Sequence, residues 1–187
     1  MKEDKYIREA ELIQHYDNNL KYYSPVSVEG YFTQMFKEFN IKIDQTSKIL
    51  DLGCGDGRIF NYVKQVSNYV GVDYSSKRID MARNKYNMHE NCSFVQSCVR
   101  EYINNNIDFD IVTAFEFLEH IIEPQNIIET ILSKCNKVKI VATLPVNMPY
   151  KAHLSVWKNI DDVVADLSPD QIHMDKGNKH FKCLWIN

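Results

Sequence analysis

The sequence predicts a single doubly wound α/β domain with a mostly parallel sheet of seven strands. Three observations predict this fold class: short apolar runs alternate with helical segments from residue 48, a glycine-rich turn follows the first run, and the last two runs flank a turn. Strands that alternate with helices pair in parallel through right-handed crossovers, with helices on both faces of the sheet. We expect one domain over residues 1–187, with a helical cap over 1–44 and the sheet region over 45–187.

The first forty residues show helical periodicity. Ser27 suits the N-cap of a helix whose apolar residues recur at i, i+3, i+4 and i+7. These apolar residues are Val28, Tyr31, Phe32, Met35, Phe36 and Phe39. A less regular helix is expected over residues 5–20. Four aromatic residues of this region suit either a lid over a ligand or ordinary core packing, and they are Tyr22, Tyr23, Tyr31 and Phe32.

Five strands and three helices are expected between residues 48 and 144. The strands are 48–52, 69–74, 92–96, 109–115 and 137–144. The helical stripes between them are Ile59, Phe60, Val63 and Val66, then Ile79, Ala82 and Tyr86, then Ile127, Ile128, Ile131, Leu132 and Cys135. Pro124 suits the first turn of the last helix, whereas the segment after Cys98 predicts a single turn. Residues 171–174 and 180–186 flank a turn and predict an antiparallel hairpin that closes the sheet.

Composition and charge exclude several classes of function. The chain has 22 Lys and Arg against 25 Asp and Glu, a formal net charge of −3 and a sequence pI of about 6.1. Basic residues are scattered singly, so we expect no nucleic-acid partner. There is no apolar run long enough for a membrane span and no signal-peptide pattern. The five cysteines show no CxxC spacing and predict reduced thiols and a cytoplasmic location.

The most informative segment is ILDLGCGDG, residues 49–57. A buried strand runs into a turn that contains Gly53, Gly55 and Gly57, and a helical segment follows. Such a turn lets the backbone approach a ligand closely, because its glycines lack Cβ atoms, and a helix N-terminus offers N–H groups. The spacing is G-x-G-x-G. The dinucleotide fingerprint G-x-G-x-x-G requires a glycine where Arg58 stands, which counts against NAD or FAD.

Asp73 ends the next strand, about 20 residues after the glycine turn. An acidic side chain there can accept hydrogen bonds from both ribose hydroxyls of a nucleoside that lies where the strand order reverses. A glycine turn alone is weak evidence for a ligand. The complete pattern is stronger evidence: a strand, the glycine turn, a helix, a second strand and an acidic residue follow one another in this order. This order predicts a nucleoside site at the carboxyl edge of the sheet.

These residues resemble the class I S-adenosylmethionine (SAM)-dependent methyltransferase family, whose fold is Rossmann-like. ILDLGCGDG matches the family's first motif, GVDYS the second, FVQSCV the third and FDIVTAFEFLEHI the fourth, and KIVATLP follows. The resemblance covers about residues 45–145 and implies SAM as the cofactor and methyl transfer as the activity.

The resemblance also implies roles for individual residues. Asp51, Gly53, Cys54, Gly55 and Gly57 are expected around the methionine part of SAM, Asp73 at the ribose, and Tyr74, Cys98 and Val99 at the adenine. Phe115 and Glu116, at the end of the fourth strand, are expected to face the methionine part and the acceptor. In one departure, Cys98 stands where the family commonly has an aspartate that binds the adenine amino group. A thiol is a weak acceptor, so the adenine is expected to depend on the backbone N–H of Val99.

His120 and His153 are the candidate catalytic residues. His120 follows the fourth strand at the edge where the acceptor is expected, and a neutral imidazole suits a general base for a hydroxyl acceptor. His153 and Trp157, beyond the fifth strand, are the next candidates, although structural hydrogen bonding or packing explains all three residues equally simply.

A metal site is the alternative interpretation of this region. The E-x-x-E-H pattern of Glu116, Glu119 and His120, with a later histidine such as His153 or His173, is similar to the metal site of the small-RNA 2′-O-methyltransferase family. Carboxylates and imidazoles can hold Mg²⁺ or Mn²⁺. The same pattern is frequent among methyltransferases without a metal, so we expect a metal-free site.

Methyl transfer from SAM to an oxygen or nitrogen of a small polar metabolite is the expected function. The alternatives are a metal-dependent RNA 2′-O-methyltransferase and a non-catalytic SAM-binding scaffold, because a fold alone does not fix an activity. The oligomeric state and the identity of the acceptor do not follow from the sequence.

Overall fold

The computed structural model describes residues 28–105 and 107–187. The predicted helix over 5–20, the Ser27 N-cap and two of the four aromatic lid candidates, Tyr22 and Tyr23, lie outside the described residues. Among the described helices, none combines the length and the apolar character that crossing a bilayer requires.

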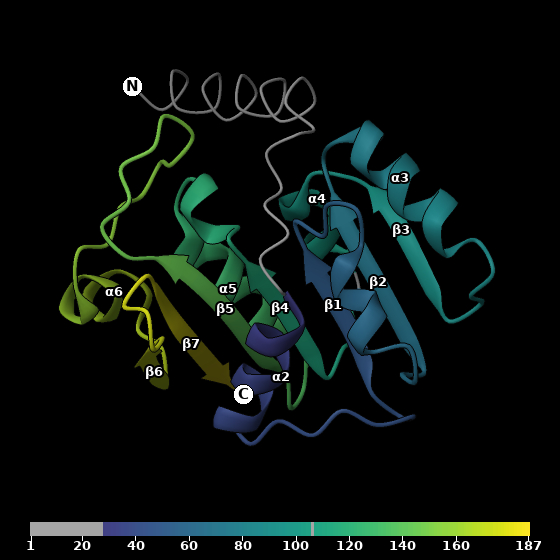
Figure 1. The fold of residues 1–187 in the computed structure, drawn as a ribbon, viewed down its shortest axis with the longest axis horizontal. Helices are drawn as coiled ribbons and strands as arrows, with labels where there is room; N and C mark the ends of the chain where they lie inside the picture. The colour runs from purple at the N-terminus through teal and green to yellow at the C-terminus, as the bar shows by residue number, and fades with distance from the viewer. Residues whose placement is uncertain (1–27, 106) are drawn as a thin grey trace.

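A seven-stranded sheet in the order β3-β2-β1-β4-β5-β7-β6 forms the centre of the described chain (Figure 1). The strands are β1 (Lys48–Leu52), β2 (Asn68–Asp73), β3 (Cys92–Gln96), β4 (Ile111–Phe115), β5 (Lys139–Pro145), β6 (Gln171–Met174) and β7 (His180–Ile186). The first five pair in parallel, and β7 runs antiparallel to both β5 and β6. The predicted fold class, strand number and closing hairpin are confirmed.

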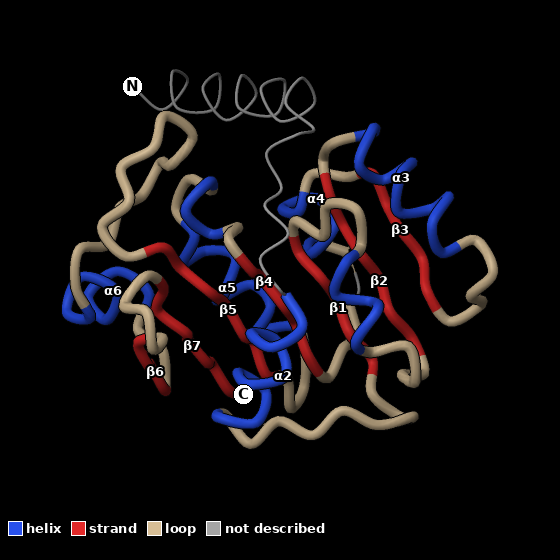
Figure 2. The backbone as a smooth tube through the Cα atoms, in the orientation of Figure 1, coloured by secondary structure: helices blue, strands red, loops and turns tan. Residues whose placement is uncertain are grey.

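Helices cover both faces of the sheet (Figure 2). On one face lie α2 (Val28–Glu38), the 3₁₀ helix η2 (Arg58–Tyr62) and α3 (Ser76–Tyr86); on the other lie α4 (Val99–Asn104), α5 (Pro124–Lys134) and α6 (Ile160–Leu167). Successive strand residues alternate between the two resulting cores: Ile49 faces the first, whereas Leu50 faces the second. This alternation makes every central strand apolar on both sides, as a helix-covered parallel sheet requires.

The segment after the glycine turn differs from the predicted α-helix. The stripe residues Ile59, Phe60 and Val63 are buried as expected, but residues 58–62 form a 3₁₀ helix. Only ten residues, 58–67, connect the glycine turn to β2. A 3₁₀ helix rises about 2.0 Å per residue against 1.5 Å for an α-helix, so it spans the length of a strand with few residues.

Two further helices differ from the predictions: α6 was not predicted, and α4 is longer than expected. Asn159 begins α6, since its side chain accepts a hydrogen bond from the N–H of Asp162 at 3.0 Å, and Val163 and Leu167 are buried. The single turn expected after Cys98 is a six-residue helix. The stripe of Ile79, Ala82 and Tyr86 lies on α3 as expected, and Pro124 is the first residue of α5.

The strand order reverses between β1 and β4. From β1 the chain proceeds outward through β2 and β3, returns to the other side of β1 as β4, and continues outward to β5. In open α/β sheets, ligands bind at the carboxyl ends of the strands at this reversal. Because β7 is antiparallel, its first residue, His180, lies opposite Pro145 and therefore at the same edge of the sheet.

Candidate functional site

Three glycines with left-handed backbone conformations shape the loop after β1. Gly53, Gly55 and Gly57 have φ angles of +68°, +53° and +74°, a region that other residues rarely adopt. The N–H groups of Gly53 and Cys54 both donate to the carbonyl of Val72 in β2, at 2.8 and 3.1 Å. A Cβ atom on Gly53 would also lie 2.4 Å from the ring of Phe117. The glycines therefore allow the loop to lie against the end of β2.

Asp73 joins this loop to the end of β2. One carboxylate oxygen accepts a hydrogen bond from the N–H of Gly55 and the other from the N–H of Ser75, both at 2.9 Å. Its backbone carbonyl accepts from Ser97, which positions Cys98 and Val99 of the next turn beside β2. Tyr74 follows and is 49% exposed. The structure thus brings together the residues predicted for the nucleoside half of the site.

Asp51 lies beneath the glycine loop. Its side chain is 1% exposed and accepts hydrogen bonds from the Tyr69 hydroxyl at 2.5 Å and the Thr113 hydroxyl at 2.7 Å. Burial raises the pKa of Asp51 to about 7, and the nearby charge of Asp73 adds to that rise. Burial also raises the pKa of the Cys54 thiol well above its ordinary value, so Cys54 is a neutral thiol. Asp51 therefore connects β1, β2 and β4 from the interior.

Glu116 and His180 face each other across the carboxyl edge. Glu116 follows β4 with φ +50°, and its N–H donates to the backbone carbonyl and the hydroxyl of Thr143 at 3.3 and 3.1 Å. His180 Nε2 lies 3.5 Å from the Glu116 carboxylate, and its Nδ1 lies 3.3 Å from that of Asp175. The hydrogen bond with Glu116 raises the pKa of His180, and Asp175 adds to the rise.

His180 was not among the predicted site residues, although one signal for it existed. The predicted hairpin brings the start of its second strand to the carboxyl edge of the sheet, and His180 is the first residue of that strand. Phe115, in contrast, was expected to face the ligand. The structure places its ring edge-on to Phe32 of α2, with 5.7 Å between the ring centroids. Phe32 is 3% exposed, which identifies it as a core residue rather than a lid residue.

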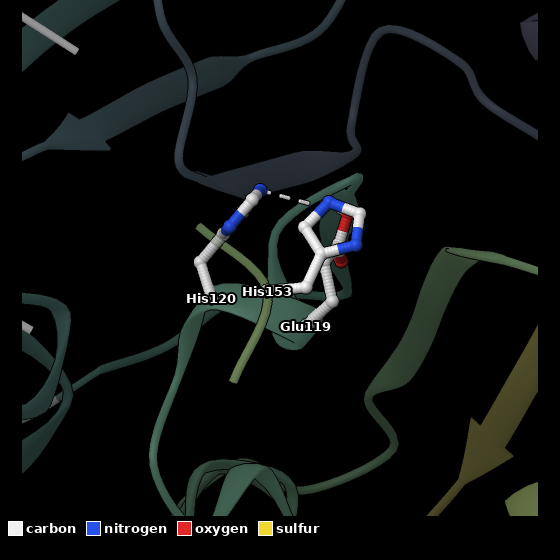
Figure 3. A group of neighbouring side chains, drawn as sticks. All are labelled: Glu119, His120 and His153. Atoms are coloured by element: carbon white, nitrogen blue, oxygen red, sulfur yellow. Dashed lines mark ion pairs between the residues drawn. The ribbon is translucent and has the colours of Figure 1, made fainter. Parts of the chain in front are cut away.

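Glu119, His120 and His153 form a cluster beyond the ends of β4 and β5 (Figure 3). Glu119 and His120 belong to the 3₁₀ helix η3 (Leu118–His120), and His153 belongs to the loop after β5. His120 Nδ1 donates to the carbonyl of Ala152 at 2.8 Å, and its Nε2 lies 3.6 Å from a Glu119 oxygen. The structure therefore brings the two predicted catalytic histidines together, with 5.0 Å between their ring centroids.

Burial disfavours the charged forms of Glu119 and His120. It lowers the pKa of His120 to about 4, and it raises the pKa of Glu119 well above its ordinary value, with the charge of Glu116 adding to the effect. His173, the other histidine considered with this motif, lies apart on β6 against the ring of Phe39. Trp157 is 3% exposed in the core and donates to Asp166, so packing explains it.

The carboxyl edge thus has two halves. The glycine loop, Asp73 and the turn at Cys98 form a half that suits a nucleoside, because glycines without Cβ atoms permit a close approach and Asp73 provides a carboxylate. Glu116, His180 and the histidine cluster form a polar half beside it that suits a second ligand. This arrangement can hold two reactants end to end at the strand reversal.

Comparisons with known proteins agree with this arrangement. A family described as a methyltransferase domain matches residues 49–138. The ubiquinone biosynthesis O-methyltransferase of Actinobacillus pleuropneumoniae serotype 7 is 26% identical over 117 residues, which cover 58% of this chain and 50% of that protein. The ubiquinone biosynthesis O-methyltransferase of Aliivibrio fischeri (strain MJ11) is 31% identical over 86 residues, which cover 44% of this chain and 37% of that protein. The chain therefore spans half or less of the length of these relatives.

Solved structures share the fold at low sequence identity. The magnesium protoporphyrin IX methyltransferase of Synechocystis PCC 6803 with bound SAM has a TM-score of 0.63 and 15% identity, covering 86% of this chain and 78% of that one. The [4+2]-cyclase SpnF has a TM-score of 0.56 and 17% identity, covering 67% and 51%. At these identities the likeness shows the fold alone.

The pKa of Asp51 predicts how stability depends on pH. Between the ordinary value of 3.8 and the folded value of about 7, the folded protein retains a proton that the unfolded chain has released. This group therefore stabilises the fold most below about pH 4, and its contribution falls as the pH rises to about 7, by on the order of 4 kcal/mol. Asp51→Asn carries no such proton and should lack that fall.

Urea unfolding of both proteins between pH 4 and pH 8 tests this expectation. The unfolding free energy of the variant relative to the original should increase across this range. The exposed Asp108, paired with Lys48 at 2.6 Å, provides the matched control through Asp108→Asn, which should not reproduce the increase. A difference between Asp51→Asn and the original protein that stays constant with pH would contradict the assigned titration.

Proposed function

We propose that this chain is a class I SAM-dependent methyltransferase that transfers the methyl group of SAM to an oxygen or nitrogen of a small polar molecule. The observation that carries the proposal is the bond between Asp73 and Gly55, because it sets an acidic side chain against a glycine loop at the strand reversal. The matched family supports this function, and the names of the relatives support an oxygen acceptor.

The nucleoside half fits SAM. Its loop backbone is fixed by left-handed glycines, so Gly53, Cys54, Gly55 and Gly57 would hold the methionine part. The two Asp73 carboxylate oxygens accept from the N–H groups of Gly55 and Ser75, and the ribose hydroxyls would share these oxygens.

The adenine would lie between the exposed ring of Tyr74 and the turn at Cys98 and Val99. Glu116 would face the methionine part, with Phe115 as the packing residue behind it. Asp51 was expected at the methionine part; because its side chain is buried, we assign it to support of the loop from below.

SAM supplies an activated methyl group when it is bound. The work left to the chain is to orient the acceptor in line with that group and to exclude water. Glu119, His120 and His153 lie beyond β4 and β5, on the acceptor side of the glycine loop, and we assign the binding and activation of the acceptor to them. A net charge of −3 and scattered basic residues favour a small acceptor over a nucleic acid.

The five free cysteines, three of them buried, support a reducing, cytoplasmic location. A related fold occurs in the [4+2]-cyclase SpnF, so SAM binding and methyl transfer need separate tests. A non-catalytic scaffold would bind SAM without consuming it.

Asp73→Ala should weaken SAM binding. The variant removes the acceptor of the ribose hydroxyls and the anchor of Gly55, and hydrogen bonds to a charged group contribute roughly 2–3 kcal/mol. We expect a loss of about 30- to 150-fold in affinity by calorimetry. The control is Asp108→Ala, at the opposite edge of the sheet. Unchanged SAM affinity in folded Asp73→Ala protein would refute the cofactor assignment.

His120→Ala should lower turnover without affecting SAM affinity. Acceptor-activating groups typically contribute about 10²- to 10⁴-fold to kcat. The acceptor comes from a SAM-dependent methylation screen over sugars, nucleotide sugars, small acids and amines, and kcat is then measured on the best substrate. His173→Ala, an exposed histidine on β6, is the control. Turnover of His120→Ala within threefold of the original enzyme on a hydroxyl acceptor would remove His120 from the mechanism.

A further inference from the structure

We propose that His180, oriented by Asp175, is a positioning residue that holds the carboxylate of Glu116 where it receives the ammonium group of the methionine part of SAM. This role rests on the proposed function and gives the β6–β7 hairpin a part in it. His180 Nε2 lies 3.5 Å from Oε2 of Glu116, and His180 Nδ1 lies 3.3 Å from Oδ2 of Asp175. One imidazole therefore joins two carboxylates from different elements at the carboxyl edge of the sheet.

Glu116 leaves the sheet beside the glycine loop. β1 and β4 are parallel neighbours with Asp51 opposite Thr113, so the segments that follow the two strands emerge side by side. The contact continues past the strands, because a Cβ atom placed on Gly53 would lie 2.4 Å from the ring of Phe117. The carboxylate of Glu116 thus belongs to a segment that lies against the loop assigned to the methionine part.

The backbone of Glu116 is fixed more firmly than its side chain. Its N–H donates to the carbonyl and the hydroxyl of Thr143 at 3.3 and 3.1 Å, and its φ angle is +50°. The side chain is 45% exposed, and the contact with His180 restrains its carboxylate. A side chain loses rotamer entropy when a ligand immobilises it, so a partner that restrains it in advance removes part of that cost.

Asp175 fixes the orientation of the imidazole. Its Oδ1 accepts hydrogen bonds from the backbone N–H groups of Lys179 and His180 at 2.7 and 3.3 Å, and its own N–H donates to the His180 carbonyl at 2.9 Å. The Val146 N–H donates to the Lys179 carbonyl at 2.8 Å, which ties the same turn to the end of β5. Because the Asp175 carboxylate lies against Nδ1, the ring presents Nε2 to Glu116.

The charges around Glu116 favour a cationic ligand group. The hydrogen bond with Glu116 raises the pKa of His180, and Asp175 adds to the rise. One imidazolium between two ionised carboxylates leaves a net negative charge. Glu119 and His120 also interact electrostatically with Glu116, but burial disfavours the charged form of each. The methionine part of SAM carries an ammonium and a carboxylate group, and Glu116 attracts the first and repels the second.

Three ligands distinguish the possible contacts of Glu116 by calorimetry. SAM carries a sulfonium and an ammonium group, S-adenosylhomocysteine keeps the ammonium without the sulfonium, and 5′-methylthioadenosine lacks the whole amino-acid part. Glu116→Gln should weaken the first two by about 10- to 150-fold, the range for hydrogen bonds to a charged group, and leave the third within about twofold. Loss for SAM alone, equal loss for all three ligands, or no loss for any would overturn the proposal.

His180→Ala tests the positioning role. It should weaken S-adenosylhomocysteine by about 3- to 10-fold, the cost of immobilising one side chain, and leave 5′-methylthioadenosine unchanged. The same substitution in the Glu116→Gln protein should have no further effect, because His180 acts through that carboxylate. His180→Gln, whose amide can still donate to Glu116, should recover part of the lost affinity.

The competing explanation is an ion pair that only ties the hairpin to the sheet. In that case His180→Ala changes the affinities of all three ligands equally or not at all, or its effect persists in the Glu116→Gln protein; each of these results would overturn the positioning role. His173→Ala, on the neighbouring strand β6, is the matched control and should leave every affinity unchanged. Circular dichroism checks folding. If His180→Ala does not fold, Asp175→Asn, which keeps an oxygen for the N–H groups of the turn, provides the same comparison of ligands.

These measurements separate the positioning role from the proposed function. If the original protein binds SAM but His180→Ala lacks the expected ligand dependence, the positioning role is refuted and the methyltransferase function stands. If the ligand dependence is present but no acceptor is methylated, the function is refuted and the positioning role stands. Failure of the original protein to bind SAM and S-adenosylhomocysteine would refute both.

Discussion

The bond between the Asp73 carboxylate and the Gly55 N–H is the interaction on which the site depends. It couples the end of β2 to the loop that leaves β1, and the carbonyl of Val72 anchors the start of that same loop. The loop can approach β2 so closely only because its three glycines adopt left-handed φ angles. Asp51 then supports the loop from the core, through Tyr69 and Thr113.

Two carboxyl groups near the carboxyl edge of the sheet are buried, those of Asp51 and Glu119. Asp51 and Glu119 are each 1% exposed, and burial raises the pKa of both. Such groups cost stability at neutral pH unless a proton or a cation compensates them. Asp51 accepts hydrogen bonds from two hydroxyl donors, and we assign it to structural support. Glu119 belongs instead to the cluster to which we assign the acceptor.

The sequence predicted the sheet well, because its strands are encoded locally. Short apolar runs and the G-x-G-x-G spacing locate β1, β2 and Asp73 without knowledge of the tertiary structure. The 3₁₀ form of η2 follows instead from the distance that its ten residues must span. The pairing of Glu116 with His180 depends on the antiparallel register of β7 against β5, and it joins residues that are far apart in the sequence.

The sequence also could not determine whether His153 or His173 lies beside Glu119 and His120. Both follow the E-x-x-E-H pattern at distances that a sequence cannot distinguish, yet only His153 reaches Glu119 and His120 among the described residues. The loop after β5 turns back because Glu119 offers its carbonyl to two N–H groups of that loop. The same turn brings the Ala152 carbonyl to His120 Nδ1 and so decides which His120 nitrogen keeps its lone pair. A backbone hydrogen bond, which carries no side-chain signature, therefore determines both the membership of the cluster and the chemistry that its imidazoles can perform.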